Sequence, residues 1–123
     1  MTTSIKSSGA SAAAIGEISV EALAKLNGSN PQITVIDVRT PAEFSEIRST
    51  VVSANIPLDQ ICDAALAAKG FGDKKKSLYV ICRSGARSMK ACEILAGLGY
   101  LQLTNVTGGT SAWSQAGLPV TSG

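Results

Sequence analysis

A cysteine followed closely by two arginines is the part of this chain best suited to chemistry. Cys82 ends the apolar run at 78–81, and Arg83 and Arg87 lie in the short segment Arg83-Ser84-Gly85-Ala86-Arg87-Ser88 that follows it. A helix is predicted to begin at about Gly85, so Cys82 lies where a strand leads into a helix N-terminus. Unpaired backbone N–H groups and the helix dipole stabilise an anion there. We therefore expect the pKa of this thiol to be lowered, which makes Cys82 a nucleophile at neutral pH.

Two further observations bear on this hypothesis. Most free cysteines are small apolar residues of the core, and Cys82 ends an apolar strand, but burial does not explain two arginines within five residues. The chain has no histidine, which excludes Cys-His and Ser-His mechanisms and every histidine-based metal site. Any catalysis therefore relies on a nucleophile that is already ionised.

Length and composition limit the remaining possibilities. The 123 residues are predicted to form a single domain at 16–123, preceded by a disordered lead-in at 1–15. A net charge of +2 is too small to indicate nucleic-acid binding, and the basic run at 74–76 is typical of a solvated loop. The three cysteines, Cys62, Cys82 and Cys92, have no paired spacing, so we expect no disulfide framework, no metal site and no cofactor.

The chain also lacks the apolar runs that targeting to a membrane requires. Its first fifteen residues contain no run of about seven to fifteen apolar residues, as a signal peptide would, and no segment approaches the roughly eighteen of a membrane span. Unpaired cysteines favour a reducing compartment. A cytoplasmic protein without a membrane partner is therefore expected.

Short apolar strands alternate with helical segments along the chain. Strands are predicted at 33–38, 53–56, 77–82 and 101–106, and helices at 20–26, 41–45, 58–68, 85–98 and 111–115. Ser19 and Thr40 are typical N-caps, Gly28 is expected to close the first helix, and Arg39 could pair with Glu43. The alternation predicts an α/β fold with a mainly parallel sheet of about five short strands and helices on both faces. Ligands of such sheets bind beyond the carboxyl ends of the strands, which is where Cys82 falls.

Four segments, in this order, resemble a single-domain rhodanese, a thiosulfate sulfurtransferase-like module. They are residues 35–44 (VIDVRTPAEF), Asn55-Ile56-Pro57-Leu58, Cys82-Arg83-Ser84-Gly85-Ala86-Arg87-Ser88, and Gly108-Gly109 followed by Ala112-Trp113 and 116–120 (AGLPV). The resemblance covers about residues 17–120. It implies a rhodanese-like fold and an active loop formed by Cys82 to Arg87.

The resemblance also implies an activity, which is the transfer of a sulfane sulfur through a Cys82 persulfide. The donor would be a small anion such as thiosulfate, and the acceptor cyanide or a thiol such as glutathione, thioredoxin or a sulfur-accepting protein. The backbone N–H groups of Arg83, Ser84, Gly85, Ala86, Arg87 and Ser88 would then surround the bound sulfur. Ser88 is further expected to cap the helix.

The roles of the charged residues near the loop stay open at this point. Arg83 or Arg87 could attract the donor, and Arg87 could instead form a structural ion pair. Asp37 and Arg39 are expected to support the site, as a salt bridge or by holding the loop. None of these residues carries a sequence signal that separates the alternatives.

Other functions are compatible with parts of the pattern. A dual-specificity-type phosphatase resembles this site but has five residues between cysteine and arginine, whereas four separate Cys82 from Arg87. Enzymes that use mercaptopyruvate as donor typically have an uncharged active loop, whereas Arg83 in this loop favours a more anionic donor. A sulfur-carrier or redox-sensing module loaded by a partner would use the same residues as an enzyme. The chain departs from the family at 47–53, where a histidine is missing, and at Thr110, where a large aromatic is frequent.

Overall fold

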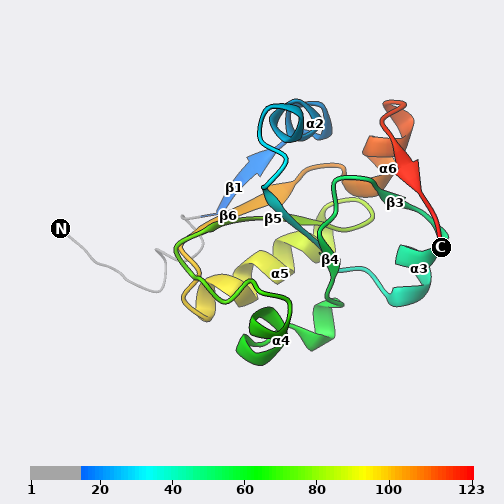
Figure 1. Cartoon of the computed structure of the whole chain (residues 1–123). Coiled ribbons are helices and arrows are strands. Elements are labelled where there is room, and N and C mark those ends of the chain that lie inside the picture. The colour runs from blue at the N-terminus through cyan, green and yellow to red at the C-terminus, as the bar shows by residue number, and fades with distance from the viewer. Residues whose placement is uncertain (1–14) are drawn as a thin grey trace.

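The computed structural model describes residues 15–123, and its centre is a five-stranded parallel sheet (Figure 1). The strands follow the order β1-β6-β5-β2-β4. Their bounds are Ile15–Ile18 for β1, Thr34–Asp37 for β2, Ala54–Asn55 for β4, Ser77–Ile81 for β5 and Gln102–Val106 for β6. The predicted lead-in lies outside the described residues except for Ile15, which begins β1, a strand that the sequence did not predict.

Helices cover both faces of this sheet, as expected for an α/β fold. α4 (Asp63–Ala68) and α5 (Ala86–Gly97) pack with the 3₁₀ helix η1 (Leu58–Gln60) against one face. α2 (Val20–Ser29) and α6 (Gly109–Gln115) cover the other, and α3 (Pro41–Glu46) lies at the end of the sheet beyond β2 (Figure 1). Within residues 15–123, no helix combines the length and apolar character that crossing a membrane would require.

Capping residues set the helix starts that the sequence predicted. The Ser19 hydroxyl accepts the Ala22 N–H at 3.1 Å at the start of α2. Thr40 and Glu43 form a reciprocal capping box around Pro41, the first residue of α3. Gly28 does not end α2, because the helix continues to Ser29. A single glycine costs only about 1 kcal/mol, which the buried apolar face of this helix offsets.

The helix predicted over 58–68 is two shorter pieces. η1 ends at Gln60, and Ile61 and Cys62 are extended before α4 begins at Asp63. Leu58, Ile61 and Leu66 nevertheless all pack against the same core cluster. The apolar residues therefore face one core although they do not lie in one continuous helix. Their spacing in the sequence did not reveal the break between η1 and α4.

The unusual segment at 47–53 contains a strand of a second, two-stranded sheet that was not predicted. β3 (Arg48–Ser49) pairs in antiparallel fashion with β7 (Val120–Thr121). The Arg48 side chain donates to the carbonyls of Phe44 and Gly123 and lies 4.4 Å above the Phe44 ring. This segment thus links α3 to the end of the chain.

Candidate functional site

The candidate nucleophile lies at the carboxyl end of β5, the central strand. Cys82 follows Ile81, and Gly85, with φ of 113°, turns the chain into α5. Only 1% of Cys82 is exposed, and its Sγ lies 3.0 Å from the Gly85 nitrogen and 3.2 Å from the Ser88 hydroxyl. The sulfur therefore lies beneath a loop of backbone amides.

These contacts lower the pKa of the Cys82 thiol. Burial is the largest influence and opposes ionisation, but hydrogen bonds from the Ser88 side chain and from the backbone N–H groups of Ser88, Gly85 and Ser84 together outweigh it. The Arg87 guanidinium also interacts favourably with the Cys82 thiolate. The loop is thus arranged to hold a sulfur anion.

The amino end of α6 anchors the other side of the loop. The Cys82 carbonyl accepts the Thr110 N–H at 2.8 Å and its hydroxyl at 3.0 Å, and the Arg83 carbonyl accepts the Ser111 N–H at 3.0 Å. Gly109 makes this approach possible, because a Cβ there would lie 2.6 Å from the Arg83 carbonyl carbon. Thr110 therefore supports the loop backbone, and it also lines an open cleft beside the loop.

Arg87 forms a bidentate ion pair with Glu43 of α3. Its Nη1 and Nη2 lie 2.8 and 2.9 Å from the two carboxylate oxygens of Glu43. The expected pairing of Arg39 with Glu43 is therefore wrong. The tertiary fold brings α5 against α3 and offers Glu43 a partner 44 residues away. Hydrogen bonding to Arg87 lowers the pKa of Glu43 to about 2, with partial burial acting in the opposite direction.

This ion pair predicts a pH-dependent stability. Because the pKa of Glu43 is lower in the folded state, the stabilisation is present near neutral pH and is lost as pH falls from about 4.5 toward 2. Both side chains are about one-third exposed, so solvent screening limits the gain to about 1 kcal/mol. We expect Glu43→Gln to lower the free energy of unfolding by about that amount at pH 7 and by progressively less below pH 4. Urea titrations at several pH values test this, and a difference independent of pH would contradict it.

Asp37 and Arg39 form a buried salt bridge at the carboxyl end of β2. The Arg39 Nη2 lies 2.8 Å from Asp37 Oδ2, and Nε contacts both carboxylate oxygens. Nη2 also donates to the Ile47 carbonyl at 2.7 Å. No hydrogen bond among the described residues joins these two side chains to the loop 82–88, so they hold the 37–47 connection beside it.

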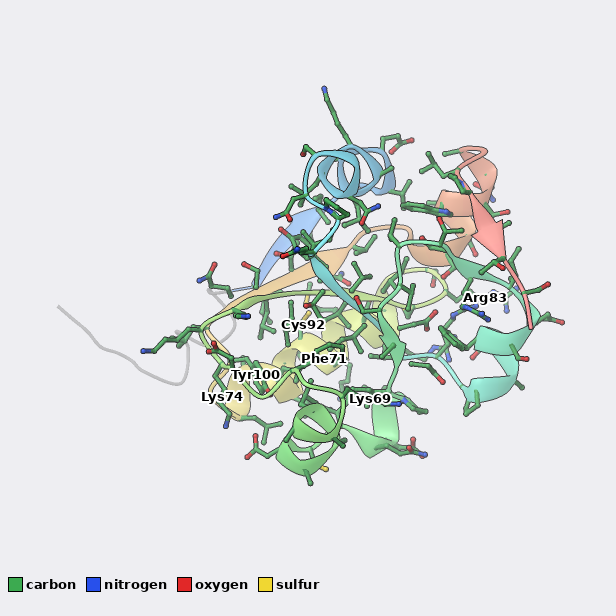
Figure 2. All side chains as sticks on the ribbon, viewed as in Figure 1. Lys69, Phe71, Lys74, Arg83, Cys92 and Tyr100 are labelled. Carbon is green, nitrogen blue, oxygen red and sulfur yellow. The ribbon has the colours of Figure 1, made fainter. Side chains whose placement is uncertain are left out.

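Arg83 is the exposed cation of the site. In contrast to Arg87, it has no ion-pair partner among residues 15–123, and Figure 2 shows it on the side of the molecule that carries α3 and α6. It borders an open cleft of about 380 Å³ beside the loop. The cleft is lined by Arg39, Glu43, Glu46, Ile47, Arg83, Thr110, Ser111, Ser114 and Gln115.

The other two cysteines lie in different environments. Cys92 is buried on the inner face of α5, and burial raises the pKa of its thiol to about 12 (Figure 2). Cys62 is exposed at the start of α4. All three cysteines are free. In the part of the chain that the structure describes, no group of three or more histidine, cysteine, aspartate or glutamate residues could hold a metal ion.

The structure corrects one expectation at the loop and adds a residue that sequence reasoning missed. Ser88 is not the cap of α5, because Gly85 holds that position and Ser88 is the third helical residue. Its hydroxyl contacts the sulfur and the buried side chain of Asn105. The available signal for Asn105 was its position in β6, because a residue two positions after Leu103 lies on the same face of the strand.

A parallel sheet with a thiol held by backbone amides beyond its central strand defines an α/β protein built to stabilise a sulfur anion. A family model described as the rhodanese-like domain matches residues 19–116, and the chain belongs to that family.

Individual proteins agree with this assignment. A sulfurtransferase of Allochromatium vinosum is 32% identical over 107 residues, which cover 86% of this chain and 94% of that protein. Thiosulfate sulfurtransferase 16 of Arabidopsis thaliana, a chloroplastic protein, is 32% identical over 68% of this chain and 76% of its own length. The solved rhodanese-like domain of an Anabaena protein has a TM-score of 0.75 at 21% identity, covering 86% of this chain and 78% of that one. The two sulfurtransferases support sulfur transfer as the general activity, and the Anabaena domain has the same fold.

Proposed function

We propose that this protein transfers a sulfane sulfur from thiosulfate, or a similar small anion, to a thiophilic acceptor through a persulfide on Cys82. The observation that carries the proposal is the contact of Cys82 Sγ with the Gly85 N–H and the Ser88 hydroxyl beneath the loop. Such a site favours a thiolate before reaction and an anionic persulfide after it. The name of the Arabidopsis relative supports thiosulfate as donor.

In the first half-reaction, the Cys82 thiolate attacks the outer sulfur of thiosulfate. A sulfur–sulfur bond forms to Cys82 while the sulfur–sulfur bond of the donor breaks, and sulfite leaves with the electron pair. Arg83 is the cation placed to attract the dianion, because Arg87 is engaged by Glu43. Positive charge near the departing sulfite lowers the barrier to this step.

In the second half-reaction, the acceptor attacks the outer sulfur of the persulfide and regenerates the thiolate. Cyanide would leave as thiocyanate, and a thiolate as its own persulfide. The cleft of about 380 Å³ beside the loop is larger than a small inorganic ion needs, so it also suits glutathione or the exposed thiol of a protein such as thioredoxin. Because this reaction requires a free thiolate, we propose that the protein works in a reducing compartment, the cytoplasm.

A sulfur carrier that is loaded by a partner protein is the second candidate. It is favoured by the burial of Cys82, which is only 1% exposed. Both functions use one persulfide, and they differ in whether thiosulfate loads it rapidly. Steady-state turnover with thiosulfate and cyanide at catalytic enzyme concentrations separates them.

The proposal is tested by intact-protein mass spectrometry after incubation with thiosulfate. We expect a gain of one sulfur, about 32 Da, and its loss when cyanide is added. Peptide mapping should place the added sulfur on Cys82 and not on the exposed Cys62. Folded, reduced protein that acquires no sulfur would overturn thiosulfate as the donor.

A second prediction concerns the charge of Arg83. We expect Arg83→Ala to slow persulfide formation from thiosulfate about tenfold, which corresponds to about 1.4 kcal/mol of lost attraction, and Arg83→Lys to restore part of the rate. Alkylation of Cys82 by uncharged iodoacetamide should stay within about twofold of the wild-type rate. An equal loss with both reagents would show instead that Arg83 acts on the ionisation of the thiol. Lys75→Ala, at the other end of the sheet beside β5, is the matched control for loss of an exposed cation.

A further inference from the structure

A buried chain of polar groups connects the candidate nucleophile to β6. Ser88 is fully buried and Asn105 is 4% exposed, so neither side chain exchanges its partners with bulk water. The Cys82 thiol donates to the Ser88 hydroxyl over 3.2 Å. The Ser88 hydroxyl in turn makes a short hydrogen bond to Asn105 Oδ1.

The amide of Asn105 is held in one orientation by its other end. Its Nδ2 donates to the Gly85 carbonyl at 3.3 Å. That carbonyl also accepts the Met89 N–H at 3.2 Å, so two N–H groups already donate to it. The Ser88 hydroxyl lies 3.1 Å from the same carbonyl, but this oxygen does not depend on the Ser88 proton. Asn105 Oδ1 has no other donor among the described residues. The Ser88 proton is therefore directed to Asn105 Oδ1.

The number of protons in this chain has a consequence for ionisation. A serine hydroxyl carries one proton, so Ser88 donates to one of three neighbouring acceptors at a time, which are Asn105 Oδ1, the Gly85 carbonyl and the sulfur. When Cys82 is a thiol, S–H donates to Ser88 and Ser88 donates to Asn105. When Cys82 is a thiolate, Ser88 must turn its proton to the sulfur, and Asn105 Oδ1 then loses the only hydrogen bond it accepts from the described residues.

We propose that Asn105 is a positioning residue that competes with the Cys82 sulfur for the Ser88 proton and so sets how readily the nucleophile ionises. The inference builds on the proposed role of Cys82. Asn105 does not touch the reacting sulfur and acts only through Ser88. Its effect opposes that of the loop amides, which favour the thiolate and, among the described residues, make no hydrogen bond to Asn105.

The ionisable groups around the sulfur must be accounted for in any test. α5 contributes Arg87 and the Cys92 thiol, α3 contributes Glu43, and the end of β2 contributes Asp37 and its partner Arg39. Arg83 follows Cys82 in the loop itself. Neither β6 nor α6 contains an ionisable side chain. Substitutions at 105 therefore leave every one of these charges in place.

The test is the pH dependence of Cys82 alkylation by iodoacetamide, followed by peptide mass spectrometry. The midpoint of the rate profile reports ionisation, while the plateau reports access to the buried sulfur. Asn105→Leu keeps the branched shape and the number of side-chain heavy atoms and removes the acceptor, so we expect the midpoint to fall by about one pH unit or less. Asn105→Asp provides only acceptors, so the midpoint should rise by about one unit or more.

Removing the mediator separates this mechanism from simple charge or packing effects. In a Ser88→Ala background, Asn105→Leu should leave the midpoint unchanged, and Asn105→Asp should retain only the part of its rise that comes from the new charge. Shifts of the same sign for Asn105→Leu and Asn105→Asp, or a shift by Asn105→Leu that persists without Ser88, would overturn the proposal. Should Asn105→Leu fail to fold, Asn105→Ala serves in its place.

Alkylation needs no sulfur donor, so this result is independent of the proposed activity. Midpoints that shift as expected in a protein that thiosulfate does not load would support the role of Asn105 while refuting thiosulfate as donor. Normal loading with midpoints that do not respond to position 105 would refute the role of Asn105 alone.

Discussion

Cys82→Ser should abolish sulfur transfer and leave the fold intact. A serine hydroxyl has a pKa far above that of a thiol and forms no persulfide, so the first half-reaction has no nucleophile and the second has no persulfide for the acceptor to attack. The hydroxyl fits the space of the buried sulfur and can still accept the Gly85 N–H, so the melting temperature should change by only a few degrees. We expect no sulfur adduct after incubation with thiosulfate and no measurable turnover with cyanide.

The other two cysteines provide matched controls for this variant. Cys62→Ser changes an exposed thiol, and Cys92→Ser changes a buried thiol whose raised pKa keeps it protonated. Both variants should keep most of the activity. Sulfur transfer that survives in Cys82→Ser would refute the assignment of the nucleophile. A folded but inactive Cys62→Ser or Cys92→Ser would require a mechanism with a resolving cysteine.

Gly109→Ala should have the second largest effect, although Gly109 is not in the loop 82–88. An alanine Cβ would lie 2.6 Å from both the carbonyl carbon and the carbonyl oxygen of Arg83, and φ of 58° is itself unfavourable for alanine. To relieve this clash, the backbone of Cys82 and Arg83 must move away from α6, and the loop N–H groups then no longer point at the sulfur. We expect at least a tenfold slower persulfide formation and a loss of about 1–3 kcal/mol of stability.

Gly117→Ala is the control that separates the clash from the backbone conformation. Gly117 also has a positive φ, of 74°, but a Cβ there would meet nothing within 4 Å. This variant should lose about 1 kcal/mol of stability and no activity. Rates of persulfide formation and urea unfolding curves, measured on both variants, show whether the clash or the backbone conformation causes the loss. Equal activities of Gly109→Ala and Gly117→Ala would show that the contact of α6 with the loop is not needed.

Local sequence patterns predicted most of the α/β scaffold. β2 and β5 lie in short β-branched or apolar runs bounded by turn residues, and α2 and α3 begin directly after Ser19 and Thr40 because these side chains cap the first turn. The strand β1 was missed because Ile15–Ile18 includes Gly16 and Glu17, so its sequence has no apolar run. It forms a strand because it pairs with β6. The β3–β7 pair was missed for a similar reason, since each strand has only two residues.

The position of Cys82 beyond β5, before a glycine turn and a helix, was also readable from the sequence, because the strand, the turn and the helix are consecutive in the chain. The partners of the loop were not readable. Glu43 meets Arg87 across 44 residues, and Thr110 meets Cys82 across 28. Such pairs depend on which strands are neighbours in the sheet.

The sequence by itself determined the candidate nucleophile, the basic loop around it and the alternation of strands and helices, because these follow from residue types at short spacing. Only the tertiary structure decided that Arg87 is held by Glu43 while Arg83 remains exposed, that Gly109 allows α6 to touch the loop, and that Asn105 reaches Ser88. The physical reason is that hydrogen bonds and ion pairs form between groups that packing brings within about 3 Å, and the sheet order of β6, β5 and β2 sets which groups these are.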